Sequence, residues 1–345
     1  MSDLDRYSRQ TLFQGIGEAG QRQIRQGRVL LCGCGALGSA IADGLVRAGV
    51  GFLRIVDRDF VELSNLQRQV LFDEQDIAEA LPKSIAAARK LAKINSTVAL
   101  DPIVADIDHT NMLALAAGTD LILDGMDNFE TRFLINDAAL ETKTPWIYGG
   151  CVGSHGQVMP VIPGQTACLR CLIGDVPGPG MTETCDTAGV IGPAVNVVAA
   201  LQVATALKFL SGQRELVEQT LVVVDVWEGT LRKMNVANLR ERSDCPACVQ
   251  GHREWLSGAR GSQTTVLCGR NAVQVSPAAR QSLVLSDLAS RLRGVGEVSH
   301  NAFLLRLTLP GEEAQLTIFP DGRAIIKGTD DITVARALYA RYVGA

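Results

Sequence analysis

Short apolar runs alternate with segments of helical periodicity over residues 28–152. An apolar run of four to eight residues is typical of a buried strand, and apolar positions three or four residues apart are typical of a helix. On this basis strands are predicted at 28–33, 52–57, 98–104, 120–124 and 146–152, with helices at 39–49, 83–94 and 128–143. This alternation predicts an α/β fold with a doubly wound, Rossmann-like parallel sheet.

The pattern changes after residue 152. Residues 153–190 are rich in Gly, Pro, Thr and Cys, which predicts a long loop of the kind that often carries function. Further predicted elements are an apolar helix at 193–210, two strands within 221–235, a polar linker at 240–269, tail helices at 285–293 and 333–342, and tail strands at 303–309, 314–319 and 324–327. We therefore expect a main domain over 1–250, with a helical lead over 1–27, and a small α+β domain over 265–345.

Composition narrows the class of protein. The chain has 345 residues, 47% of them hydrophobic, which is enough to build a sizeable core. The net charge is −4 and no basic stripe stands out, so a nucleic-acid partner is not expected. The N-terminus lacks an apolar signal core, and no uninterrupted apolar run reaches the ~20 residues of a membrane span. We expect a cytoplasmic protein with no membrane contact, whose nine cysteines are reduced.

A glycine motif, Gly33-x-Gly35-x-x-Gly38, lies between the first predicted strand and the first predicted helix. Glycines at this spacing allow a tight turn, and the helix N-terminus favours an anionic phosphate. Asp57 ends the second strand, where an acid can bind ribose hydroxyls. The sequence therefore predicts a nucleotide site, for which an NAD-dependent oxidoreductase is the default interpretation.

The residues beyond Asp57 favour a different chemistry. Asp59, Asn65, Arg68 and Lys83 bring acids, an amide and cations close to the predicted nucleotide. Hydride transfer needs few charges there, whereas phosphoryl or nucleotidyl transfer needs cations that neutralise a triphosphate. Any one of these residues taken alone is better explained as part of a solvated charged loop. There is no GxxxxGK[ST] segment, so a P-loop ATPase is not expected.

The fourth predicted strand ends in an acidic segment, Asp124-Gly-Met-Asp127-Asn128. An acid at the carboxyl end of a parallel strand faces the ligand crevice, and Mg²⁺ prefers oxygen ligands that it shares with phosphates. Asp127 is therefore a candidate Mg²⁺ ligand. The alternative is that Asp127 caps the helix that begins at Asn128.

Four cysteines form two Cys-x-x-Cys pairs, Cys168/Cys171 and Cys245/Cys248. Four thiolates close a tetrahedral structural zinc site, so the pairs predict one shared Zn²⁺ ion; redox pairs or unrelated buried thiols are the alternatives. Cys185, in the loop before residue 193, is either an incidental thiol or a nucleophile.

These features together resemble the ubiquitin-activating-like adenylyltransferase family of ThiF, MoeB and HesA. The matching segments follow the family's order: 6–10, the glycine motif, 57–59, 63–69, 82–83, 124–128, both cysteine pairs and 184–193. The resemblance implies that ATP is the nucleotide and that Gly33, Gly35 and Gly38 cradle its phosphates. It implies that Asp57 holds the ribose and that Asp127 positions Mg²⁺. It implies that the triphosphate is bound by Asn65, Arg68 and Lys83, and that Asp59 and Asn128 also contact the nucleotide. It also implies that Arg9 is an arginine finger donated across a homodimer and that Cys185 is the thiol nucleophile.

The resemblance also implies a reaction. A small β-grasp sulfur carrier ending in Gly-Gly would attack the α-phosphate of ATP through its C-terminal carboxylate, which gives an acyl-adenylate and pyrophosphate. Thiamine (thiazole) biosynthesis is the favoured pathway, and a cysteine desulfurase is a further candidate partner. The alternatives are a molybdopterin carrier, a peptide substrate, the NAD-dependent oxidoreductase and a non-catalytic scaffold. The tail is too short for a rhodanese domain, so carrier docking or dimer support is expected of it.

Overall fold

A computed structural model describes residues 4–176, 188–260, 264–267, 271–276, 283–310 and 314–343. The chain divides into two compact units, Met1–Arg260 and Gly261–Ala345.

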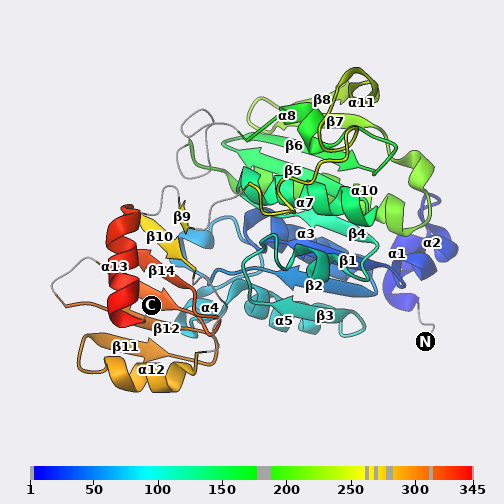
Figure 1. Cartoon of the computed structure of the whole chain (residues 1–345). Coiled ribbons are helices and arrows are strands. Elements are labelled where there is room, and N and C mark those ends of the chain that lie inside the picture. The colour runs from blue at the N-terminus through cyan, green and yellow to red at the C-terminus, as the bar shows by residue number, and fades with distance from the viewer. Residues whose placement is uncertain are drawn as a thin grey trace. The chain divides into compact units, whose positions relative to one another are not determined.

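The first unit contains a mixed sheet and the helices that cover it (Figure 1). Its strands are β1 (Arg28–Cys32), β2 (Phe52–Val56), β3 (Ala99–Ile103), β4 (Leu121–Asp124), β5 (Trp146–Val152), β6 (His155–Val161), β7 (Thr220–Asp225) and β8 (Thr230–Asn235). Its α-helices are α1 (Ser8–Thr11), α2 (Gly17–Ile24), α3 (Ala36–Ala48), α4 (Glu74–Ala78), α5 (Lys83–Ile94), α6 (Met112–Ala116), α7 (Phe129–Thr142), α8 (Leu169–Ile173), α10 (Gly192–Leu210) and α11 (Leu239–Arg242). Short 3₁₀ helices are η1 (Asp5–Tyr7), η2 (Leu63–Asn65) and η3 (Arg214–Leu216).

The strand order is β3-β2-β1-β4-β5-β6-β7-β8. The first five strands are parallel, which confirms the predicted Rossmann-like sheet. The last three pairings are antiparallel. For β5 and β6 the reason is their connection: Gly153 and Ser154 can close a hairpin but are far too few for a crossover between parallel strands.

Side chains of the central strands point alternately to the two faces of the sheet, and each face is buried in its own hydrophobic core. Val29 and Leu31 of β1 face one side and pack with α3, α5 and α10, while Leu30 and Cys32 face the other and pack with α6, α7 and α8. Because successive side chains of a strand point to opposite faces, a parallel strand covered by helices is apolar throughout, as its sequence predicts.

Helix α10 is the one helix among the described residues whose length and composition would suit a membrane span. Its buried residues include Ala194, Val198 and Phe209, and it packs against α3, β5 and β6. The helix is therefore a core element of this unit. Its fully buried Gln202 donates a hydrogen bond of 3.2 Å to the carbonyl of Asp124 at the end of β4.

Two predictions about irregular segments are wrong. The segment 153–190 contains β6 and α8 besides its loop, because residues 155–161 pair with both β5 and β7. Residues 240–260 of the predicted linker 240–269 are part of the first unit, since Trp255 is buried and its ring lies 5.7 Å from that of Phe133. The linker prediction failed because its polar residues serve in ion pairs rather than in solvent.

The second unit is an antiparallel sheet with the strand order β11-β12-β13-β14-β10-β9. Its elements are β9 (Thr264–Leu267), β10 (Ala272–Val275), α12 (Leu285–Leu292), β11 (Glu297–His300), β12 (Leu305–Thr308), β13 (Gln315–Ile318), β14 (Ala324–Lys327) and α13 (Ile332–Tyr342). Leu288, Leu307, Ile326 and Ala335 belong to one buried cluster, so α12 and α13 cover the sheet. The strands β9, β10 and β11 had no counterpart in the sequence-based prediction.

Candidate functional site

The three glycines of the motif meet different surroundings. Gly33 has φ +87°, and a Cβ there would lie 2.7 Å from the carbonyl oxygen of Gly125. A Cβ at Gly38 would overlap the carbonyl oxygen of Gly33. Gly35, the N-cap of α3, has open space above it: the nearest atom to an added Cβ is Gln69 Nε2, at 3.9 Å. Two glycines thus allow close backbone packing, and the third leaves an open cradle at a helix N-terminus, where an anion is favoured.

Asp57 is joined to this loop by its carboxylate. Its Oδ2 accepts a hydrogen bond of 2.6 Å from the backbone N–H of Cys34, and its Oδ1 accepts one of 2.7 Å from the N–H of Asp59. Burial raises the pKa of the Asp57 carboxyl, while Lys83 and these two N–H donors act in the opposite direction. Burial, with the nearby Asp57, also raises the pKa of the Cys34 thiol, so Cys34 is a neutral packing residue.

Lys83 and Asp59 form a buried ion pair beside Asp57. The Lys83 side chain is only 4% exposed, and its Nζ lies 3.1 Å from Asp59 Oδ2. The backbone N–H of Lys83 also donates to the carbonyl of Asp59, at 2.8 Å. The first position of α5 therefore fixes a cation next to the two acids.

A second cation, Arg58, was missed by the sequence reasoning. Its Nη1 donates to both carboxylate oxygens of Asp106, at 3.0 and 3.1 Å. Burial alone would lower the pKa of the Arg58 guanidinium, but Asp106, Asp59 and Asp127 together raise it. Arg58 thus connects the acids that follow β2 and β3 with Asp127, which follows β4. Its position between Asp57 and Asp59 is not a distinctive signal, because arginines are common among acids in exposed loops.

The 63–69 segment lies over the glycine loop. Asn65 is buried and its Oδ1 accepts the N–H of Glu62 in a capping box, so this oxygen serves the local turn. Arg68 donates to the carbonyl of Ser64 at 2.9 Å and is partly exposed. The buried Gln69, which had no predicted role, has no hydrogen-bond partner for its Oε1 among the described residues.

A buried ion pair supports the acidic segment after β4. Arg132 Nε on α7 lies 2.9 Å from Asp124 Oδ2, and the Arg132 Nη2 donates to the carbonyls of Met126 and Gly149 at 2.6 and 2.9 Å. This pair holds the loop that presents Asp127, whose side chain is exposed. The helix is capped by Asn128, whose Oδ1 accepts the N–H of Thr131 at 2.9 Å, so the alternative capping role belongs to Asn128 rather than to Asp127.

Arg9 lies at the opposite end of the sheet. The lead segment docks where α3 ends, since Gln10 Nε2 donates to the carbonyl of Ala48 at 3.0 Å and Tyr7 Oη accepts from Asn95 Nδ2 at 2.8 Å. The glycine cradle is at the other end of this 13-residue helix, roughly 20 Å away. Arg9 is exposed and cannot serve the nucleotide site of its own chain.

The two cysteine pairs are 77 residues apart in sequence, and their four side chains lie together in the structure. Cys168 Sγ lies 3.8 Å from Cys171 Sγ and 3.6 Å from Cys245 Sγ, and Cys171 Sγ lies 3.3 Å from Cys248 Sγ; all four sulfurs are within 4.8 Å of one another. Zn–S bonds of about 2.3 Å in a tetrahedron place sulfurs about 3.8 Å apart. The cluster therefore fits a structural zinc ion, and the redox and unrelated-thiol alternatives are disfavoured.

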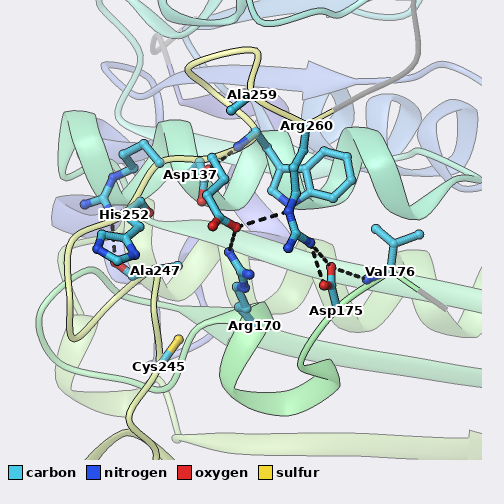
Figure 2. Close-up of polar contacts among 12 residues, drawn as sticks. Asp137, Arg170, Asp175, Val176, Cys245, Ala247, His252, Ala259 and Arg260 are labelled. Carbon is cyan, nitrogen blue, oxygen red and sulfur yellow. Dashed lines mark hydrogen bonds and ion pairs between the residues drawn. The ribbon is translucent and has the colours of Figure 1, made fainter.

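Ion pairs hold the zinc segments against the rest of the unit. Figure 2 shows Arg170 of α8 and Arg260 drawn toward the same carboxylate group, with Asp175 beside Arg260. Arg170 Nη1 and Arg260 Nε lie 2.7 and 3.2 Å from Glu254 Oε2, and Arg260 Nη1 donates to Asp175 Oδ1 at 2.6 Å. Asp137 of α7 accepts the N–H of Trp255 at 3.0 Å. Residues 254–260 are thereby fixed on α7 and α8.

Cys185 lies outside the described residues, so its predicted role stays a prediction. The chain after it is anchored, because the N–H of Gly153 donates to the carbonyl of Gly189 at 2.8 Å and that of Ile191 donates to the carbonyl of Gly153 at 3.1 Å.

The arrangement as a whole fits a nucleotide triphosphate better than a redox cofactor. An open cradle at Gly35, the orphaned amide oxygen of Gln69 and the buried cation Lys83 gather at one edge of the sheet. One serine, histidine and acid do meet after β5: Ser154 Oγ donates to Asp225 Oδ1 at 2.9 Å, and His155 Nε2 lies 3.2 Å from Asp225 Oδ2. The serine hydroxyl donates to the carboxylate rather than to an imidazole base, which is not the order of a catalytic triad. The open cradle, the amide oxygen and the buried cation therefore form the candidate site. Such a site binds and polarises phosphates, and it needs no general base if the nucleophile is already ionised.

Comparison with known proteins gives one consistent family. The ThiF family model matches residues 7–247. The chain is 43% identical over 340 residues to the Sulfur carrier protein ThiS adenylyltransferase of Bacillus subtilis, covering 98% of this chain and 99% of that protein. It is 38% identical over 251 residues to the protein of the same name from Escherichia coli, covering 72% of this chain and 97% of that protein. The crystal structure of E. coli MccB with ATP is similar with a TM-score of 0.59 and 26% identity, covering 71% of this chain and 73% of that one.

Proposed function

The chain belongs to the ThiF family, and from this premise we propose that it adenylates the C-terminal carboxylate of a small sulfur carrier protein with ATP. The proposal names the carrier of thiazole synthesis, because two relatives named for ThiS align with this chain over nearly their whole length. The predicted enzyme class, a nucleotidyltransferase, agrees with the names of these relatives.

The observation that carries the proposal is the open cradle at Gly35 beside the buried Lys83–Asp59 pair. Backbone N–H groups at the start of α3 bind phosphate oxygens there, and Lys83 and Arg68 reduce the negative charge that develops as pyrophosphate leaves. The attacking carboxylate is ionised at neutral pH and needs no base.

Two metal ions have different roles in this proposal. Asp127 has an exposed carboxylate after β4, so it would hold Mg²⁺, which would offset the negative charge of the phosphates. The four cysteines would hold Zn²⁺, which joins α8 to the segment 245–248 and has no part in the chemistry.

The position of Arg9 supports a homodimer. Because Arg9 is roughly 20 Å from its own cradle, a finger role requires a second chain, and the exposed Leu12 and Phe13 beside it, at 71% and 64% exposure, suit such a contact. Cys185 and a cysteine desulfurase would act after adenylation, when sulfur is delivered to the activated carrier. We place the enzyme in the cytoplasm, in keeping with its reduced cysteines.

Adenylation belongs to the first unit in this proposal. The E. coli relative aligns over 97% of its own length with only 72% of this chain, and the family match ends at residue 247. The second unit would therefore contribute to partner binding or dimer support.

ATP–pyrophosphate exchange tests the proposal. Purified thiazole-pathway and molybdopterin-pathway carriers are added in separate reactions, each with a control lacking its Gly-Gly terminus. Exchange that depends on one carrier identifies the pathway. Exchange with neither carrier, in protein shown to be folded and zinc-loaded, would refute the sulfur-carrier assignment and favour a peptide substrate.

Mixing two inactive variants tests the shared site. Arg9→Ala and Asp127→Ala are each expected to lose exchange, and a mixture is expected to regain up to about a quarter of wild-type activity, since random exchange of subunits leaves one intact site in half of the dimers. No recovery after verified subunit exchange would show that Arg9 does not act across a dimer.

A further inference from the structure

Arg58 is a half-buried cation in the nucleotide site with no role in the proposed reaction. Its side chain is 21% exposed, its Nη1 binds both oxygens of Asp106, and its Nε lies 3.8 Å from Asp59 Oδ1. Two carboxylates thus fix two edges of the guanidinium plane. Neutralising the two carboxylates needs only a positive charge, which a flexible lysine would also provide. The fixed orientation of the guanidinium plane is therefore a separate feature of Arg58.

The location of Arg58 follows from the strand order. The glycine cradle follows β1, Asp57 and Arg58 follow β2, and Asp106 lies three residues after the end of β3. A nucleotide with its phosphates on the cradle and its ribose at Asp57 extends along the carboxyl edge of the sheet, from β1 toward β2. Its base then lies on the side of β2 and β3, where the Arg58–Asp106 pair is.

The flat faces of the guanidinium are the surface that this pairing leaves for a ligand. Among the described residues no aromatic ring lies over Arg58, whereas Arg132 and Arg54 each lie within 6 Å of a ring centroid. A guanidinium plane stacks on aromatic faces through cation–π and planar contact. An anion is a poorer occupant, because the Nε and Nη1 edges already face carboxylates and the carboxylates would repel it.

We propose that Arg58, oriented by Asp106, is the platform on which the adenine ring of ATP stacks. Arg58 is then a binding residue for the nucleobase and Asp106 is a positioning residue that acts through it. The inference rests on the proposed use of ATP but assigns a contact that is independent of the phosphates and of the carrier protein.

Calorimetric titration with ATP and with inorganic tripolyphosphate, both with Mg²⁺, tests this assignment. In Arg58→Ala the Kd for ATP is expected to rise roughly 3- to 30-fold, the range for a partly desolvated cation–π contact, and the Kd for tripolyphosphate is expected to stay unchanged. Arg58→Lys keeps the charge but not the plane, so most of the loss should persist. Asp106→Asn should give a smaller loss of the same kind.

Arg54→Ala is the matched control. Arg54 also joins β2 to β3, with its Nε 2.7 Å from Asp101 Oδ2 and its side chain 18% exposed, but it lies within the strand and away from the crevice. It should lower the melting temperature without changing either Kd. An unchanged ATP Kd in Arg58→Ala, or full rescue by Arg58→Lys, refutes the stacking role. Equal weakening of tripolyphosphate shows a phosphate contact and refutes it as well. Failure of the wild-type protein to bind ATP would instead refute the proposed function.

Discussion

Replacing Gly38 by alanine should destabilise the fold, whereas replacing Gly35 by alanine should weaken ATP binding. In Gly38→Ala the new Cβ overlaps the carbonyl oxygen of Gly33 and lies 2.8 Å from its carbonyl carbon. Both are backbone atoms of a loop that is also fixed by Gly125, so neither can move cheaply. In Gly35→Ala the nearest atom is 3.9 Å away, at the end of the flexible Gln69 side chain, so the folded protein accommodates the methyl group.

The magnitudes differ accordingly. Overpacking of this kind costs about 1–3 kcal/mol or more, which corresponds to a fall in melting temperature of about 2–12 °C for a unit of this size. Gly35→Ala should leave the melting temperature nearly unchanged but place a methyl group where a phosphate would lie. Loss of one hydrogen bond to a charged group costs about 1.5–3 kcal/mol, so ATP should bind about 10- to 150-fold more weakly.

Differential scanning calorimetry without nucleotide, followed by ATP titration of each variant, separates the two effects. Gly33→Ala serves as a second packing variant, since its Cβ would also meet Gly125 and its φ is positive. If Gly35→Ala melts as early as Gly38→Ala, Gly35 is a packing glycine and the open cradle is refuted. If Gly35→Ala folds normally and binds ATP with wild-type affinity, no phosphate lies at Gly35.

Three further changes probe other parts of the chain. Cys171→Ser should reduce bound zinc, measured by elemental analysis, and lower the melting temperature, whereas retained zinc would show that Cys171 is not a ligand. Arg170→Met should lower the free energy of unfolding by about 1 kcal/mol and the melting temperature by about 2–4 °C. Because Arg170 lowers the pKa of Glu254 below its ordinary 4.5, the difference in melting temperature from wild type should be constant from pH 6 to 8 and shrink only below about pH 4.5. A difference that persists unchanged at pH 4 would contradict this. Lys83→Met should slow pyrophosphate exchange at least about 100-fold while the protein stays folded, since an electrostatic contact at the transition state is worth that much; near-normal exchange would limit Lys83 to pairing with Asp59.

The parallel half of the fold could be predicted from sequence because its signals are local. The strands β1 to β5 are mostly apolar, with Arg54 in β2 and Asp101 in β3 as interruptions, and α5 begins and ends where its periodicity does, at Lys83 and Ile94. The antiparallel strand β6 was missed, since His155, Gly156 and Gln157 interrupt its apolar pattern and its strand state depends on pairing with β5 and β7. The ordered segment around Trp255 was missed for a related reason: its partners, Phe133 and Asp137, lie about 120 residues earlier.

The candidate site divides in the same way. Gly33, Gly35, Gly38, Asp57 and the four zinc-site cysteines could be named from spacing, because residues that follow neighbouring strands or share a knuckle have few ways to be arranged. Arg58 and Arg132 could not, since a single arginine among acids has no distinctive spacing and its partner depends on which strands are neighbours.

By itself the sequence determined the elements of the parallel half of the sheet, the position of the glycine loop and the family, all of which depend on residue identity at short and fixed separations. Only the tertiary structure decided that Gly35 is open while Gly33 and Gly38 are closed, that Lys83 pairs with Asp59, and that Arg9 lies about one helix length from its own cradle. The physical reason is that these properties are distances between segments brought together by strand order and packing, and the local sequence of neither segment specifies them.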